Sequence, residues 1–325
     1  MSRRKFTRRD FLRSSAALPA AIFAAQGLPS PSLADALPNA AEAPGPLLPY
    51  EPALRDRLWM WGHGPRTTDT LYSIPKGNGI DQVDAIRSMG IPNLCVIRWL
   101  NSPEPEKTED PTKPPFGEFC KKLTDTKRVA WSIIDGGAQS YEQKKKWGFD
   151  LARQMPNLTT LFLDDFFTDI PNGSTITEVK AHLSVDQLKD LRSEMATLPR
   201  PVELAAVLYS GQLDPGIRPF LDQCDVVSFW TWAATDLAAL EKNFRRYREI
   251  LPEKRTLLGV YMWDFGNMRP VTPEMMTHQL DFALEMFRKK EIEGFIFHCT
   301  PLCDLNLAAV EQSRTWIREH GDEVW

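Results

Sequence analysis

Strand-like and helix-like segments alternate eight times along residues 57–320 of this chain. The strand-like segments are short, nearly continuous apolar runs, as is typical of strands that are buried on both faces. They cover residues 57–63, 93–100, 128–135, 158–165, 202–209, 225–232, 256–264 and 293–300. Eight strand–helix units in a chain of this length are the pattern of a closed parallel barrel. The sequence therefore predicts one α/β domain over residues 57–325, a single (β/α)8 TIM barrel.

An open, doubly wound sheet also alternates strands with helices, but it often carries a glycine-rich nucleotide loop after its first strand. Residues 61–65, Trp-Gly-His-Gly-Pro, lack the spacing of such a loop. The sequence also holds no Walker-type loop, no zinc-type cysteine spacing and no His-Glu-x-x-His pattern. We therefore favour the barrel and expect neither a cofactor nor a metal ion.

The N-terminal region has the features of an export signal. Arg8 and Arg9 are followed by a Phe-Leu pair, an alanine-rich apolar run over residues 16–25 and small residues suited to cleavage at 34–36. Residues 1–36 thus resemble a bacterial twin-arginine signal peptide, which implies a periplasmic or extracellular protein. A proline- and alanine-rich lead-in over residues 37–56 would then precede the barrel.

Charge and hydropathy narrow the range of partners. Removing residues 1–36 takes away six basic and two acidic residues, which changes the formal net charge from −4 to −8. An acidic protein is a poor candidate for binding nucleic acid or an anionic membrane. No apolar run reaches the ~20 residues that span a bilayer, so we expect no membrane anchor after signal removal. The oligomeric state stays open.

Seven of the ten tryptophans fall in the predicted strands or at their ends. A flat indole face stacks on the C–H face of a sugar ring while its N–H donates to a hydroxyl, so a tryptophan-lined barrel mouth suits carbohydrate. Trp59, Trp131 and Trp230 lie deeper in their strands, where core packing is the better explanation. The candidates for substrate binding lie at or near the strand ends: Trp61, Trp99, Trp232 and Trp263.

Aspartates stand at the ends of three predicted strands, as Asp135, the pair Asp164 and Asp165, and Asp264. The C-terminal strand ends of such a barrel form its active site. Two carboxyl groups can cleave a glycosidic bond there, one protonating the leaving oxygen and the other attacking the sugar or activating water. We predict Asp164, Asp165 and Asp264 as catalytic residues and Asp135 as a substrate-binding residue. The competing interpretation of each acid is a helix cap or a loop ion pair.

Other polar residues at strand ends fit as supporting groups. Arg98 could hold a carboxylate or a sugar hydroxyl through its planar fork, and His63, His298 and Tyr209 could hydrogen-bond substrate. We predict all four as substrate-binding residues. A histidine that simply completes the core remains the alternative for either histidine.

The five cysteines are Cys95, Cys120, Cys224, Cys299 and Cys303. In an oxidising compartment, Cys299 and Cys303 could form a disulfide across a short loop. The odd count leaves a free thiol, and a buried cysteine packs as a small apolar residue.

With acids after its fourth and seventh strands, the chain resembles a glycoside-hydrolase-type (β/α)8 barrel. Many retaining members place the acid/base after the fourth strand and the nucleophile after the seventh, where this chain has Asp165 and Asp264, although the commonest pattern has Glu at both. The chitinase-type motif Asp-x-x-Asp-x-Asp-x-Glu is absent from residues 163–167, and Asp236 stands several residues late for a sixth-strand acid of the alpha-galactosidase type. The resemblance covers the whole barrel as architecture and implies hydrolysis of a neutral or weakly charged oligosaccharide or polysaccharide.

Two other classes stay open. A polysaccharide lyase or sugar isomerase would use Asp164 or Asp165 with His298 or His63 to abstract a proton. A non-catalytic carbohydrate-binding barrel would need the tryptophans but not the aspartates. Aspartate-to-asparagine variants that lose turnover but keep binding distinguish hydrolysis from binding alone, and an unsaturated product would indicate elimination.

Overall fold

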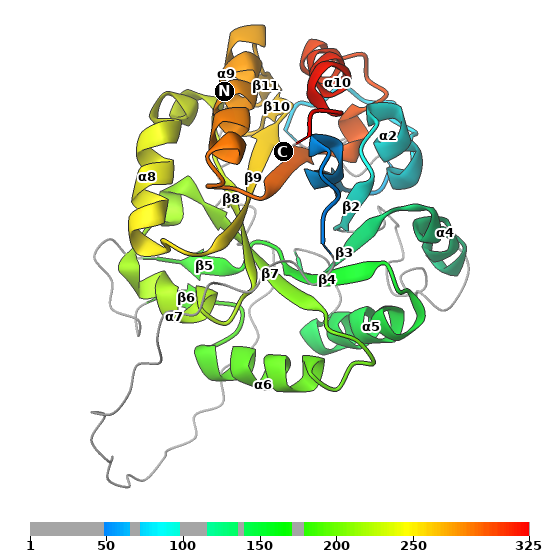
Figure 1. The fold of residues 1–325 in the computed structure, drawn as a ribbon, viewed down its shortest axis with the longest axis vertical. Helices are drawn as coiled ribbons and strands as arrows, with labels where there is room; N and C mark the ends of the chain where they lie inside the picture. The colour runs from blue at the N-terminus through cyan, green and yellow to red at the C-terminus, as the bar shows by residue number, and fades with distance from the viewer. Residues whose placement is uncertain (1–48, 66–71, 98–115, 136–139, 171–178, 325) are drawn as a thin grey trace, which may run out of the picture. The chain divides into compact units, whose positions relative to one another are not determined.

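The structure, a computed structural model, describes residues 49–65, 72–97, 116–135, 140–170 and 179–324 (Figure 1). Internal contacts divide the chain into two units, residues 1–45 and 46–325, and all described residues belong to the second unit. The predicted signal peptide and most of the predicted lead-in lie outside the described residues.

Eight parallel strands close into a barrel, as the sequence predicts (Figure 1). Around the barrel the order is β1, β12, β9, β8, β7, β4, β3, β2, so each strand pairs with its neighbours in chain order once the small strands are left out. The barrel strands are β1 Leu58–Gly62, β2 Asn93–Val96, β3 Arg128–Ile134, β4 Leu158–Leu163, β7 Glu203–Tyr209, β8 Val226–Trp230, β9 Arg255–Tyr261 and β12 Gly294–His298.

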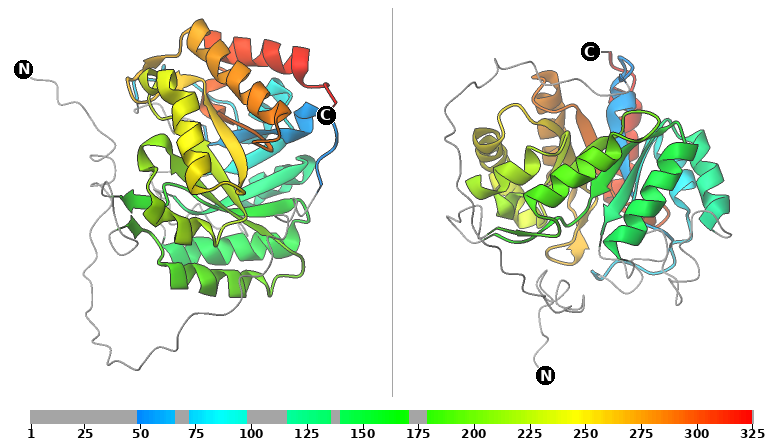
Figure 2. Two further views of the ribbon diagram at one scale, coloured as in Figure 1. Left: turned by 60° about the vertical axis from the view of Figure 1, so that its left-hand side comes forward. Right: turned by 90° about the horizontal axis from the view of Figure 1, so that it is seen from below.

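Helices surround the barrel on its outer side (Figure 2). They are α2 Gln82–Met89, α4 Phe116–Lys122, α5 Tyr141–Gln154, α6 Val185–Met195, α7 Arg218–Leu221, α8 Leu240–Ile250, α9 Pro273–Arg288 and α10 Ala308–His320. Short 3-10 turns are η1 Leu54–Arg57, η2 Leu123–Asp125, η3 Ser210–Gln212, η4 Pro215–Ile217, η5 Ala234–Ala239 and η6 Thr300–Leu302. Within the described ranges, no helix combines the length and the apolar character that crossing a membrane requires.

Side-chain caps set the starts of several helices. Ser184 accepts from the backbone N–H of Gln187, whose side chain accepts in return from the Ser184 backbone N–H. This capping box satisfies two backbone donors at the start of α6. At the start of α9 the Thr272 hydroxyl accepts from the backbone N–H of Met275, and Pro273 at the first helical position needs no hydrogen-bond acceptor.

Two strand ends differ from the sequence-based prediction. The fourth predicted strand, residues 158–165, pairs only as far as Leu163, because the backbone turns into the left-handed region at Asp165. The seventh, residues 256–264, leaves the barrel after Tyr261 and continues as the hairpin of β10 Trp263–Asp264 and β11 Arg269–Pro270. A second hairpin, β5 Phe167–Asp169 with β6 Lys180–Ala181, follows the fourth strand.

Large aromatic side chains fill the inside of the barrel. The Trp61 ring lies 5.2 Å, centroid to centroid, from both Phe162 and Trp230, which come from β4 and β8. Trp230 takes the space above Gly259 of β9, where a Cβ atom would lie only 1.9 Å from Trp230 Cε3. Only glycine fits at this position, because any side chain would displace the indole.

The three tryptophans predicted to pack in the core are buried. Trp230 points inward, whereas Trp131 contributes to the outer face of β3, where a Cβ on Gly148 of α5 would lie 3.4 Å from Trp131 Cδ1. Trp59 donates its indole N–H to the Tyr50 hydroxyl at 3.3 Å. The prediction of core packing is confirmed for all three.

Charged side chains occupy the N-terminal end of the barrel. Arg255 Nη1 lies 2.6 Å from a Glu203 oxygen, and Arg255 Nε lies 2.8 Å from a Glu293 oxygen. Burial lowers the pKa of Arg255, but the charges of Glu293 and Glu203 more than offset this and raise it. The guanidinium therefore stays charged between the two carboxylates.

The residues that lead into the barrel close the same end. Tyr50 lies between two guanidinium groups, with its ring 4.2 Å from Arg128 Cζ and 4.5 Å from Arg57 Cζ. Arg128 also pairs with Asp56 at 3.1 Å and donates to the Pro49 carbonyl at 2.7 Å. Hydrogen bonds and cation–π contacts thus hold residues 49–57 against the barrel base.

Candidate active site

The fourth barrel strand delivers the paired aspartates to the C-terminal mouth. Asp164 follows the last residue of β4, and its backbone N–H donates to the Ile134 carbonyl of β3 at 2.8 Å. Burial raises the pKa of the Cys95 thiol of β2, and the nearby charge of Asp164 raises it further. The Asp164 side chain is buried.

Asp165 has a different environment. Its φ of 47° lies in the left-handed region, which costs a residue other than glycine on the order of 1–3 kcal/mol. The Tyr209 hydroxyl at the end of β7 donates to Asp165 Oδ1 at 2.9 Å. Phe166 and Phe167, which follow, are fully buried and anchor the turn. Of the two adjacent aspartates, Asp165 is thus held by the end of β7 through Tyr209, whereas Asp164 is the more buried.

Tyr209 is itself fixed by Gln212. The Gln212 side-chain oxygen accepts from the Tyr209 backbone N–H at 3.0 Å, and its amide donates to the Phe167 carbonyl at 3.3 Å. Gln212 is buried and connects the end of β7 to β5. Nothing in the sequence pattern singles out this glutamine.

His298, at the end of β12, stands within a ring of aromatic side chains. The ring centroids of Trp61, His63, Trp230, Tyr261 and Phe265 lie 4.6–5.9 Å from its own. Burial in this environment, with a smaller contribution from His63, holds the pKa of His298 well below its ordinary value. Its buried Nδ1 makes no hydrogen bond to any described residue. The imidazole is therefore neutral near pH 7 and has hydrogen-bonding capacity to offer.

Trp232 is the most exposed of the three predicted tryptophans that the structure describes, so it offers the best stacking surface among them. It is partly exposed and packs against Tyr72, Tyr209, Tyr261 and Phe265, with ring centroids 5.6–6.1 Å away. In contrast, Trp61 and Trp263 are only 3% and 2% exposed. The Trp263 indole N–H donates to the Tyr72 carbonyl at 3.0 Å. Burial of these two side chains favours packing over direct contact with a sugar.

Asp264 is enclosed by its own loop. Its carboxylate accepts from the backbone N–H groups of Ala234 and Asn267 at 3.0 and 3.1 Å, and from the Asn267 side-chain amide. Arg269 Nε lies 3.2 Å away, and Asp264 is 1% exposed. This arrangement favours the structural alternative, in which Asp264 holds the β10–β11 hairpin rather than attacking substrate.

Asp135 forms an ion pair, the alternative considered for strand-end acids. Lys144 Nζ of α5 lies 2.5 Å from Asp135 Oδ1, and both side chains are buried. His63 lies beside His298 with its carbonyl accepting from the Thr300 hydroxyl at 2.6 Å. Arg98 and Trp99 lie outside the described residues, so their predicted roles stay predictions.

Cys299 and Cys303 are free thiols in the structure, so the disulfide considered from the sequence is not formed. Both are buried, and burial raises the pKa of Cys303 to about 12. No group of three metal-ligating side chains occurs among the residues that the structure describes.

Several residues around the mouth escaped sequence analysis: Tyr72, His182, Gln212, Tyr261 and Phe265. Tyr261 could have been predicted from the sequence. It lies two residues after Gly259 on β9, so the two residues face the same side of the strand, toward the inside of the barrel. His182 follows β6, and its backbone N–H donates to the Phe166 carbonyl beside Asp165. Desolvation lowers its pKa, while the nearby charge of Asp165 opposes this change.

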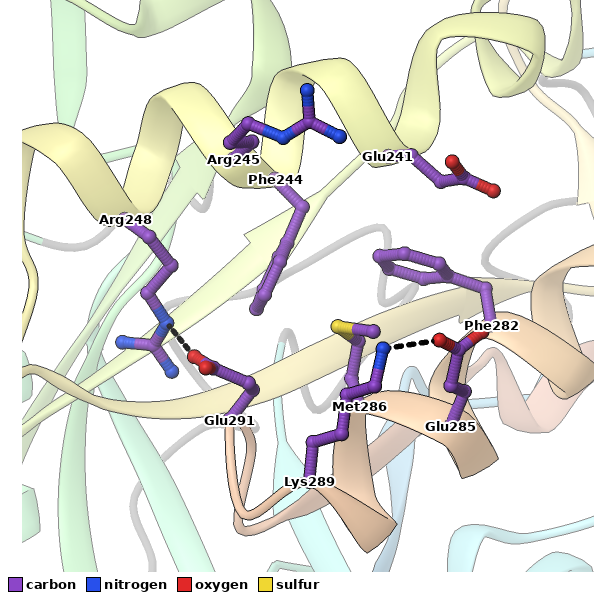
Figure 3. A pocket seen from close by; sticks show the side chains of 9 residues that line it. All are labelled: Glu241, Phe244, Arg245, Arg248, Phe282, Glu285, Met286, Lys289 and Glu291. Atoms are coloured by element: carbon purple, nitrogen blue, oxygen red, sulfur yellow. Dashed lines mark hydrogen bonds and ion pairs between the residues drawn. The ribbon is translucent and has the colours of Figure 1, made fainter.

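A further hollow lies on the outer surface, between α8 and α9 (Figure 3). It has a volume of about 340 Å³ and an apolar base of Phe244, Phe282 and Met286. Charged side chains at its rim pair with each other, as in the 3.2 Å contact between Arg248 and Glu291. None of the strand-end aspartates lines this hollow. Because those aspartates lie at the C-terminal ends of the barrel strands, we place the candidate active site at the barrel mouth.

Comparisons with known proteins agree on the fold. No protein-family model and no curated protein matches the sequence of this chain. A chitinase active domain 2 from Pyrococcus furiosus superposes with a TM-score of 0.50 at 16% identity, covering 85% of this chain and 98% of that one. A protein named as a candidate alpha-L-fucosidase from Bacteroides thetaiotaomicron also reaches 0.50, at 9% identity over 87% and 98% of the two chains. The resemblance to a glycoside-hydrolase-type barrel is thus confirmed at the level of architecture.

Proposed function

We propose that this protein is an exported glycoside hydrolase that cleaves a glycosidic bond in a neutral or weakly charged glycan. The observation that carries the proposal is the pair Asp164 and Asp165 at the end of the fourth barrel strand, beside a mouth lined by aromatic rings. Carboxyl pairs at this end of a barrel are suited to glycosidic cleavage. The similar chitinase structure supports the proposal as an example of this chemistry on the same architecture.

The two aspartates have environments that suit different roles. Asp164 is the more buried and would donate its proton to the glycosidic oxygen as the bond to the anomeric carbon breaks. Asp165 accepts a hydrogen bond from Tyr209 and would act in its charged form, either by bonding to the anomeric carbon or by activating the water that does so. Water supplies the hydroxyl group and proton that complete the two products.

Substrate recognition would combine stacking with hydrogen bonds to hydroxyl groups. The partly exposed Trp232 offers a ring face, while the neutral His298 and the neighbouring His63 offer ring nitrogens for hydrogen bonds. Lys144 and Arg269, two cations near strand ends, already pair with Asp135 and Asp264. This pairing favours an uncharged sugar over a uronate. Arg98 and Trp99 remain further proposed substrate contacts.

Hydrolysis is favoured over elimination or isomerisation by the state of His298. A general base works best when its pKa lies near the working pH. Burial holds the pKa of His298 well below its ordinary value, so the imidazole is a weak proton acceptor. Hydrogen bonding to a hydroxyl suits this side chain better than abstraction of a carbon-bound proton.

The test is product analysis after the purified full-length protein is incubated with a panel of oligosaccharides and 4-nitrophenyl glycosides in ¹⁸O-labelled water. We expect ¹⁸O in the new reducing end and a loss of at least ~10²-fold in turnover for both Asp164→Asn and Asp165→Asn. Asp169→Asn is the matched control, because Asp169 is exposed on the neighbouring hairpin. A bound glycan that is never cleaved would support a binding barrel instead, and an unsaturated product would support a lyase.

Export through the twin-arginine route is a separate part of the proposal. The residues that support it are Arg8 and Arg9 with the apolar run over residues 16–25. Changing both arginines to lysine should retain the protein in the cytoplasm of a bacterial host, as measured by cell fractionation. Export that continues without the arginine pair would contradict this route.

A further inference from the structure

We propose that Tyr209 is a positioning residue that holds Asp165 in its working orientation, with Gln212 fixing the turn behind it. This inference rests on the proposed glycoside hydrolase function and changes the role of Tyr209 from the substrate contact expected from the sequence. The hydroxyl of Tyr209 lies 2.9 Å from Asp165 Oδ1 and donates its proton to that oxygen. A phenol has one proton to donate, so this donor is committed to the carboxylate.

The location of Tyr209 fits a supporting role. Only 8% of its surface is exposed, and its ring meets Trp232 edge-on at 6.0 Å between centroids. The aromatic contact fixes the plane of the phenol, while β7 fixes its backbone. The hydroxyl is therefore presented to Asp165 from a rigid barrel strand, which is a more exact support than a loop would give.

Gln212 completes a closed set of contacts around the Asp165 turn. It accepts from the backbone N–H of Tyr209 and donates to the carbonyl of Phe167, two residues after Asp165. The turn is therefore held at its carboxylate by Tyr209 and at its backbone by Gln212. Loss of either contact would remove one of these two supports from the turn.

The backbone of Asp165 explains why such support is needed. A non-glycine residue at a φ of 47° is held there by its surroundings rather than by its own preference. The hydrogen bond from the Tyr209 hydroxyl sets the direction of Asp165 Oδ1 at this turn. A displacement of about 1 Å in a reacting group can lower a rate ~10²-fold.

The decisive experiment compares Tyr209→Phe with Tyr247→Phe in the full-length protein. Tyr247 is a matched control, because it is also buried and its hydroxyl lies 2.7 Å from the Thr256 hydroxyl, but it belongs to α8 on the outer side of the barrel. With the glycoside that the wild type turns over, Tyr209→Phe should lower kcat at least ~10-fold and leave KM within about twofold. Tyr247→Phe should change neither. A raised KM with unchanged kcat would mean that the phenol binds substrate directly and would overturn the proposal.

Gln212→Met provides a second variant in case Tyr209→Phe does not fold. It should lower kcat in the same direction, by roughly threefold to tenfold, with little effect on KM. Unchanged kcat in both folded variants would overturn the inference.

Failure of the proposed function can be told apart from failure of this inference. If the wild type hydrolyses no member of the panel, crystal structures of the wild type and Tyr209→Phe still show whether the phenol orients the carboxylate. An Asp165 carboxylate that turns away in the variant supports positioning by Tyr209. A carboxylate in the same orientation in both structures overturns it, whatever reaction the protein performs.

Discussion

The two ends of the barrel treat polar groups in opposite ways. At the N-terminal end, Arg255 lies between Glu203 and Glu293, and the guanidinium of Arg128 pairs with Asp56. At the C-terminal end, Asp165 occupies a left-handed backbone conformation and the Nδ1 of His298 has no hydrogen-bond partner among the described residues. At the base, ion pairs join neighbouring strands. At the mouth, ion pairs such as Lys144 with Asp135 stand beside a strained backbone and an imidazole nitrogen that a ligand could reach.

This contrast assigns different consequences to substitutions at the two ends. A change at the base should lower the free energy of unfolding and leave the chemistry of the folded fraction intact. A change at the mouth should affect turnover more than stability.

The largest effect is expected at the base. Arg255→Met should lower the free energy of unfolding by about 3–5 kcal/mol, because two buried carboxylates lose their common partner. The measurement is chemical denaturation of the variant and the wild type. Arg246→Met is the control, since Arg246 forms an exposed pair with Glu249 that contributes less than about 1 kcal/mol. Equal effects of the two substitutions would contradict the division.

Gly259→Ala tests the packing of the barrel interior below the mouth. The added Cβ would lie 1.9 Å from Trp230 Cε3, so the indole must move, at a cost of about 1–3 kcal/mol. Because Trp230 also contacts His298, we expect lower stability together with lower turnover. Thermal unfolding and steady-state kinetics measure the two effects, and a variant with normal Tm and kcat would refute tight packing at this position.

His298 should make the free energy of unfolding of the protein depend on pH. Its pKa is lowered in the folded protein, so as the pH falls His298 is protonated in the unfolded chain before it is protonated in the folded protein. Stability from the neutral imidazole is therefore present above pH ~6.5 and is lost as the pH falls below that value, by up to about 1.4 kcal/mol per pH unit. Unfolding experiments between pH 7 and pH 5 should show a weaker pH dependence for His298→Phe than for the wild type. Parallel curves would show that His298 does not titrate differently on folding.

Asp264→Asn should have the smallest effect. An asparagine keeps one oxygen that can accept from Ala234 and Asn267, but its amide NH2 replaces the oxygen that accepts from Arg269 and from the Asn267 side chain, so a loss of about 1–2 kcal/mol is expected. Turnover should fall less than ~10-fold if Asp264 only holds its hairpin. A loss comparable to that of Asp165→Asn would restore Asp264 as a catalytic residue, the role predicted from the sequence.

The strands and several helix starts were predictable because their causes are local. Strands buried on both faces read as apolar runs, and Ser184 with Gln187 forms a capping box within four residues. The roles of the strand-end acids were not predictable, because sequence places Asp135, Asp165 and Asp264 at equivalent points. Their contacts distinguish them. Asp135 forms an ion pair with Lys144, Asp264 anchors its loop through Asn267, and Asp165, which accepts from Tyr209, is the candidate catalytic group.

The eightfold strand–helix alternation can be read from the sequence, as can the end of the barrel where a site would form and the residue types available there. The partners of those residues, which separate candidate catalytic groups from structural ones, depend on the closed barrel. Hydrogen bonds such as those of Tyr209, Gln212 and Asp264 join residues brought together by the closing of the barrel or by a hairpin, and their geometry depends on backbone direction. Successive side chains of a strand point to opposite faces, so their orientation can be predicted from the sequence. The orientation of a turn residue such as Asp165 depends on the neighbouring residues that contact it.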